Sequence, residues 1–103
     1  MPTDMTVANT ILEQLGGRRF LMFTGARDLT GDATSLTFKL PKAKDGIKSV
    51  KVNLDPSDTY TVTFYKIARA PSRAVTVVKE SSDVYCDSLV ELFETTTGLY
   101  THL

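Results

Sequence analysis

The 103-residue chain has few of the side chains that most often carry catalysis or bind metals. It contains one cysteine (Cys86), one histidine (His102) and no tryptophan. A single cysteine cannot form an internal disulfide or a cysteine-based zinc site, and it suits a reducing compartment. His102 is the penultimate residue, and no second histidine is present to share a metal site with it. The sequence therefore predicts a protein that is not an enzyme and that binds no cofactor or metal.

Long apolar runs are also missing. No stretch approaches the roughly 18 to 20 apolar residues that cross a bilayer, and the first ten residues, MPTDMTVANT, lack the basic and apolar regions of a secretion signal. We therefore expect a cytoplasmic protein with no membrane partner. With 42% hydrophobic residues, the chain suits one domain over residues 1–103 with a single core.

The formal net charge is zero, but the two signs are segregated along the chain. All twelve Lys and Arg residues lie between Arg18 and Lys79, together with only five of the twelve acidic residues. This window therefore has a net charge of +7, and the flanks have a net charge of −7. The pI of about 6.6 argues against strong non-specific binding to nucleic acid.

Hydrophobic spacing predicts a helix over residues 5–15 that ends at Gly16. The aromatic and apolar run Arg19 to Thr24 is short and is followed by Gly25, so we expect it to be the first strand. The glycines here follow a helix instead of preceding one, which does not fit a phosphate-binding loop. Residues 26–34, ARDLTGDAT, are typical of a turn.

Alternating patterns predict four more strands, over residues 35–40, 49–54, 60–65 and 74–80. A last helix is expected after Ser82 or Asp83, which can cap it, and it should end at Gly98. Cys86 falls near its start, and we interpret it as a small core side chain. The connections are too short for parallel crossovers, so the prediction is an α+β fold of order α-β-β-β-β-β-α. Its five-stranded antiparallel meander carries both helices on one face.

Strand alternation divides the sheet into a core face and an open face. The predicted core residues are Leu36, Phe38, Leu40, Val50, Val52, Leu54, Tyr60, Val62 and Phe64. The predicted open face carries Thr37, Lys39, Lys51, Asn53, Thr61, Thr63, Tyr65 and Thr76, together with Leu21 and Phe23.

Three groups of charged or aromatic residues are candidates for partner binding. The first, on the open face, is Lys39, Lys51 and Tyr65, which can serve single-stranded nucleic acid. The second is basic and lies in loops: Lys42, Lys44 and Lys48 in one hairpin, and Arg69 and Arg73 in the next, which need not share an end of the sheet. The third is acidic and lies on the last helix: Asp87, Glu91 and Glu94. A solvated surface is the simpler interpretation of each group.

Four segments spread over nearly the whole chain form a recognisable pattern. They are ILEQLGGRRFLMFTGARD (11–28), LTFKLP (36–41), GIKSVKVNLDPSDTYTV (46–62) and VYCDSLVELFETTTGLYTHL (84–103). Within them the motifs QLGG, TGA, FKLP, DTY and TGL follow one another. In this combination the chain resembles a widespread family of small proteins encoded by bacteriophages, prophages and plasmids. The resemblance implies an origin and brings no catalytic or cofactor-binding residue with it.

Three functional hypotheses follow from the sequence. The first is a non-enzymatic accessory protein of a phage or mobile element that binds a host or phage protein, for example to inhibit a host defence system in the manner of an anti-CRISPR protein. The second is a nucleic-acid-binding module that uses Lys39, Lys51 and Tyr65. The third is a structural component that assembles as a homo-oligomer.

Overall fold

A computed structural model of the protein describes residues 6–41, 43, 46–67 and 74–99. Its elements, in chain order, are α1 (Thr6–Leu15), α2 (Arg18–Thr24), β1 (Arg27–Gly31), β2 (Ser35–Lys39), β3 (Ile47–Leu54), β4 (Tyr60–Ile67), β5 (Val75–Val84), the short 3-10 helix η2 (Cys86–Ser88) and α3 (Leu89–Thr97).

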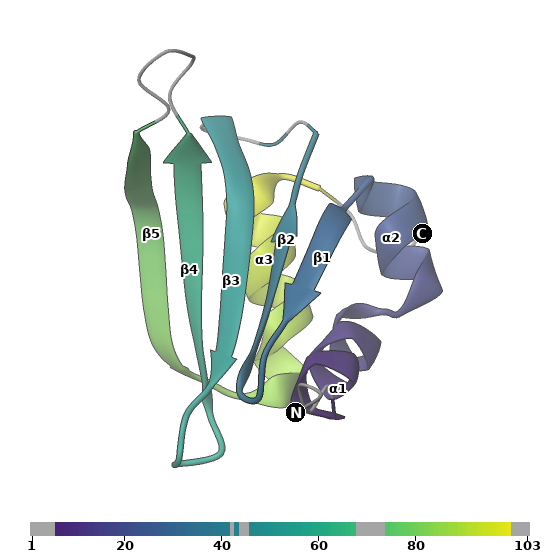
Figure 1. The fold of residues 1–103 in the computed structure, drawn as a ribbon, viewed down its shortest axis with the longest axis vertical. Helices are drawn as coiled ribbons and strands as arrows, with labels where there is room; N and C mark the ends of the chain where they lie inside the picture. Colours follow the sequence, from purple (N-terminus) through teal and green to yellow (C-terminus); the bar gives the residue numbers. More distant parts are fainter. Residues whose placement is uncertain (1–5, 42, 44–45, 68–73, 100–103) are drawn as a thin grey trace.

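The five strands form one open antiparallel sheet in the order β1-β2-β3-β4-β5. Figure 1 shows α3 behind the sheet and α1 and α2 next to the β1 edge of the sheet. No described helix lies in front of the sheet. The predicted α+β class and antiparallel meander are therefore confirmed, with one helix more than the sequence predicted.

Three phenylalanines from three different elements hold the helices to the sheet. Phe20 of α2 makes edge-on contacts with Phe38 of β2 and Phe93 of α3, each at 5.1 Å between ring centroids, and Phe38 and Phe93 lie 6.0 Å apart. All three rings are buried. Eight of the nine predicted core residues are buried as expected, and Leu54 is partly buried against the core. We call the three rings the aromatic cluster.

Helix α1 docks through a polar contact as well as through Ile11 and Leu15, which are buried. The Tyr60 hydroxyl of β4 donates to Oε1 of Gln14 at 2.6 Å. Burial raises the pKa of Tyr60 above its ordinary value, with a smaller contribution from the nearby Cys86. The phenol therefore stays protonated and keeps its role as donor.

The predicted first strand, Arg19 to Thr24, is wrong, because these residues form α2. Phe20 and Thr24 are spaced by four residues and are both buried, so the segment has one helical face. Gly25 adopts the left-handed conformation of a helix cap, and its N–H donates to the Leu21 carbonyl at 3.0 Å. Gly25, predicted to end a strand, therefore caps a helix.

The expected turn at residues 26–34 contains the true first strand, β1. Asp28, a turn-forming residue, has a positive φ of 54°. It lies between the pairs Arg27–Lys39 and Thr30–Thr37, where two residues of β1 face one residue of β2. The turn-forming residues of this segment therefore form a β-bulge within an edge strand.

The expected start of the last helix at Ser82 or Asp83 is also wrong. Strand β5 continues to Val84, and Asp83, at φ 56°, lies in a bulge between the pairs Tyr60–Val84 and Val62–Ser81. Helix α3 begins at Leu89 and ends at Thr97, with Gly98 as the cap that the sequence predicted. Cys86 lies in η2 and is exposed, so its interpretation as a core residue is wrong.

Replacing Phe20 with alanine should lower the free energy of unfolding by about 3–5 kcal/mol, because it opens a cavity in the aromatic cluster. Urea denaturation measures this change. Met22, on the same helix, is 74% exposed, so Met22→Ala is a matched control that should change stability by no more than about 0.5 kcal/mol. Similar losses for the two variants would contradict the placement of α2.

Gly25→Ala should destabilise the protein by about 2 kcal/mol, which combines backbone strain with a steric clash. Gly25 has a φ of +71°, and a Cβ there would lie 2.9 Å from Cγ of Pro41. Gly17, at φ +60°, has no atom within 4 Å of such a Cβ, so Gly17→Ala should cost only about 1 kcal/mol. Equal thermal unfolding temperatures for the two variants would show that Pro41 does not pack against Gly25.

Candidate functional site

No described helix lies over the sheet face opposite the helices (Figure 1), and strand pairing orders its side chains into rows. The face is not uniformly exposed, because Thr63 on it is only 6% exposed. The first row runs across all five strands, and we call it the Tyr65 row: Arg27, Lys39, Ser49, Tyr65 and Val77. The second lies beside it, and we call it the Lys51 row: Thr30, Thr37, Lys51, Thr63 and Glu80. Paired residues in antiparallel strands project to the same face.

The structure brings together the candidates predicted for the open face. Lys39 and Tyr65 belong to the Tyr65 row, with Ser49 between them, and Lys51 lies in the next row. Adjacent strands are about 4.8 Å apart, so the Lys39 and Tyr65 backbones are separated by roughly twice that distance. Ser49, between them, and Tyr65 are both partly exposed.

Other predicted open-face residues lie elsewhere. Thr76 pairs with Lys66 and so lies on the helix side, because Val78 is an extra residue in β5 that reverses the alternation. Val75 and Val77 take the open-face positions instead. Leu21 and Phe23 belong to α2 and not to the sheet.

The acidic candidates lie on a different surface from the basic ones. Asp87 is in η2, and Glu91 and Glu94 are in α3, on the helix side of the sheet. The arrangement therefore does not combine them with Lys39, Lys51 and Tyr65 in one site.

The basic loop candidates Lys42, Lys44, Arg69 and Arg73 lie outside the described residues. The strands that these two loops connect nevertheless end at the same end of the sheet, because Ile47 pairs with Lys66. We call this the basic end, and Arg27 and Lys39 lie there too. The sequence did not decide whether the two hairpins share an end of the sheet; the described strand ends that flank them lie at one end.

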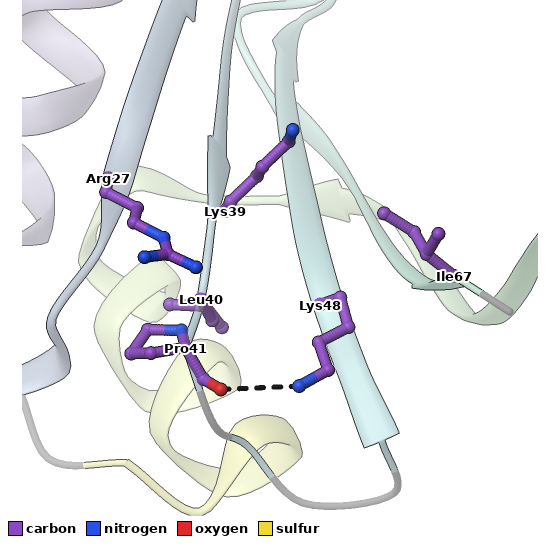
Figure 2. Close-up of a pocket in the computed structure, with 6 residues that line it drawn as sticks. All are labelled: Arg27, Lys39, Leu40, Pro41, Lys48 and Ile67. Carbon is purple, nitrogen blue, oxygen red and sulfur yellow. Dashed lines mark hydrogen bonds between the residues drawn. The ribbon is translucent and has the colours of Figure 1, made fainter. Parts of the chain in front are cut away.

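A hollow of about 300 Å³ opens at the basic end and was not predicted as a site. We call it the basic hollow. It is lined by Arg27, Lys39, Leu40, Pro41, Lys48 and Ile67. Figure 2 shows Arg27 reaching from β1 and Lys48 from β3 on either side of the chain at Leu40 and Pro41, and the Lys39 side chain on β2 points away from both.

Two irregularities in the backbone shape the basic hollow. Strand β1 bulges just after Arg27, and β3 has Lys48 as an extra residue between the pairs Ile47–Lys66 and Ser49–Tyr65. Bulges bend a strand and change the direction of its side chains. They therefore explain why Arg27 and Lys48 converge on the end of β2.

The cations of the hollow have few partners of opposite charge. Lys39 Nζ lies 3.9 Å from Oδ2 of Asp28, and both side chains are more than half exposed. The Lys48 ammonium donates to the Pro41 carbonyl at 3.3 Å. An exposed ion pair of this length contributes little to stability, so these positive charges remain accessible to an anion.

The opposite end of the open face is held by carboxylates. Asp32 accepts hydrogen bonds from the N–H groups of Thr34 and Ser35 at 2.9 and 2.8 Å. Asp55 accepts from Asn53 at 3.0 Å and from the Thr61 hydroxyl at 2.6 Å. These contacts fix the turns before β2 and before β4, and they set an acidic end against the basic end.

Comparisons with known proteins give no functional assignment. No protein-family model, curated protein or solved structure matches this chain. Across the part of the chain that the structure describes, no three His, Cys, Asp or Glu residues are close enough to hold a metal ion. No described helix has the length and apolar character to span a membrane. The resemblance to phage proteins therefore stays a prediction.

Asp32→Ala should lower the thermal unfolding temperature at pH 7, because the turn before β2 loses its acceptor. Hydrogen bonds from Thr34 and then Ser35 lower the pKa of Asp32 below its ordinary 3.8. Because the pKa of Asp32 is lower in the folded protein, its ionised carboxylate stabilises the fold at pH values above the unfolded-state pKa. This contribution is lost as the pH falls through the folded-state pKa. The difference between wild type and variant should therefore shrink below about pH 4, and a constant difference from pH 7 to pH 2 would contradict it.

Proposed function

We propose that this chain is a non-enzymatic accessory protein of a phage or mobile element that binds a host or phage protein through its open sheet face. The proposal places it in the bacterial cytoplasm, with inhibition of a host defence system as one form of the activity. Its origin rests on the sequence resemblance, and its mode of action rests on the composition of the open face.

The observation that carries the proposal is the division of the Tyr65 row of the open face into a basic part and an apolar part. Arg27 and Lys39 occupy the β1–β2 side of the Tyr65 row, and Tyr65 and Val77 occupy the β4–β5 side. Val75 and Val77 are 61% and 53% exposed. A cluster of aliphatic and tyrosine side chains with charged residues at its rim is typical of protein interfaces.

The charge of the open face indicates the chemistry of the partner. Arg27, Lys39 and Lys48 gather at one end, with Asp28 as the carboxylate within ion-pair range of Lys39. Opposite charges increase the rate of association and exclude like-charged partners. The partner surface should therefore combine an apolar patch with carboxylates at one side.

Nucleic acid is the second candidate, and the position of Tyr65 favours it specifically. A base stacked on Tyr65 would place its phosphates toward Lys39 and Lys51, which lie on the same face. Only one aromatic side chain lies on the described part of this face, whereas sheet platforms for RNA commonly use two or three. We therefore rank a protein partner first.

Val77→Asp should abolish capture of the partner, because it puts a negative charge in the apolar part of the Tyr65 row. The measurement is affinity capture from host-cell lysate with quantitative mass spectrometry. Thr76→Asp is the matched control, since it adds the same charge one residue away on the helix side of β5. A partner held equally by wild type, Val77→Asp and Thr76→Asp would contradict binding through the open face.

The nucleic-acid alternative has a separate readout. Binding of a fluorescent single-stranded oligonucleotide that weakens with rising salt and is lost in Tyr65→Ala would favour it over a protein partner. The absence of such binding at low salt would remove it.

A further inference from the structure

We propose that the basic hollow is a binding site for a small phosphomonoester. The inference rests on the charge, shape and backbone of the hollow, and it does not depend on the macromolecular partner proposed above. The ligand is an organic molecule with a terminal phosphate group and a compact carbon skeleton.

The charge of the hollow matches a dianion. Among the described lining residues, the Arg27 guanidinium and the Lys48 ammonium supply two positive charges, while the Lys39 ammonium points away from both (Figure 2) and lies within ion-pair range of Asp28. A phosphomonoester carries about −1.5 to −2 near pH 7. Carboxylates, sulfate esters and phosphodiesters carry only one negative charge and would leave the hollow positively charged.

The donors are of the right kind for phosphate. The Arg27 guanidinium offers paired N–H groups that match two phosphate oxygens, and lysine acts as a mobile point charge. Lys48 already has its ammonium bound to an oxygen, the Pro41 carbonyl at 3.3 Å. The ammonium can keep that bond and still donate to a ligand, because it has three N–H groups. The phosphate therefore fits between β1 and β3, over the end of β2.

The remaining lining is apolar and limits the size of the ligand. Leu40, Pro41 and Ile67 contribute carbon atoms to a hollow of about 300 Å³. Small-molecule sites range from about 300 to 1,000 Å³ and combine apolar walls with a few polar groups. The hollow thus suits a single ring or sugar that packs on Pro41 while its phosphate meets Arg27 and Lys48; Ile67 lies on the other side of β3 from Pro41 (Figure 2).

The backbone supports the view that the hollow is a built feature. The bulges at Asp28 and at Lys48 lie in the two strands that flank β2. Gly25 contributes to it indirectly, because Pro41 packs where a Cβ of residue 25 would lie. Bulges are frequent beside binding sites, where they redirect side chains.

The test is isothermal titration calorimetry with phenyl phosphate, phenyl sulfate and inorganic phosphate as probes. Phenyl phosphate should bind most tightly. Its affinity should be about tenfold higher than that of phenyl sulfate, because phenyl phosphate has a second negative charge. It should also be about tenfold higher than that of inorganic phosphate, because phenyl phosphate has a ring. Equal affinity for phenyl phosphate and phenyl sulfate, or no binding of phenyl phosphate, would overturn the proposal.

Variants locate the site. Arg27→Gln and Lys48→Gln should each weaken phenyl phosphate binding by about tenfold. Lys51→Gln removes the same charge from the next row, outside the hollow, and should leave binding within about twofold. Circular dichroism confirms that each variant is folded, and Arg27→Met or Lys48→Met serves in place of one that is not. An equal loss in Lys51→Gln would show diffuse attraction to the open face and would overturn the site.

Two further probes distinguish the sources of the phosphate. Adenosine monophosphate and ribose 5-phosphate present the same phosphate with and without a base. Binding of both with similar affinity would assign the hollow to sugar phosphates, and a preference for adenosine monophosphate would assign it to nucleotides. Failure of both, with inorganic phosphate as tight as phenyl phosphate, would overturn the requirement for a carbon skeleton.

Discussion

The aromatic cluster is the contact on which the rest of the structure depends. Phe20, Phe38 and Phe93 come from α2, β2 and α3, and their mutual contacts at 5.1 to 6.0 Å fix both helices on one side of the sheet. Large buried aromatic side chains contribute more apolar area than other residues. Because the described helices are all committed to this side, the other face has no helix to cover it and must be solvated or bound.

The open face is organised along the strands as well as across them. Asp32 and Asp55 use their carboxylates to hold the turns at one end. At the other end, bulges in β1 and β3 bring Arg27 and Lys48 to the end of β2. This separation differs from the segregation of charge along the sequence, because Asp32 and Asp55 belong to the basic window of residues 18–79. Carboxylates serve structure at one end of the face, and cations remain available to an anion at the other. This division links the proposed partner surface and the basic hollow without requiring that one ligand fill both.

Sequence patterns predicted the fold class, the antiparallel order, most of the core and the shared face of Lys39, Lys51 and Tyr65, because alternation in the central strands is regular. They failed at both edges of the sheet. A seven-residue helix such as α2 has too few turns to show a period, and the sequence of β1 resembles a turn. Strand β5 was predicted, but its last residues, Ser82 and Asp83, resemble a helix cap, so its end was missed. The basic hollow could not be predicted, since it arises from bulges, which depend on the pairing of distant strands.

The most direct test of this account is thiol labelling on the two faces of the sheet in a Cys86→Ala background. Lys39→Cys lies on the open face, and Val50→Cys replaces a buried residue on the core face. The account predicts that residue 39 is labelled at nearly the rate of a free thiol, at low and high protein concentration, and that residue 50 reacts only through unfolding. Protection of residue 39 in the isolated protein, or similar labelling rates at both positions, would contradict it.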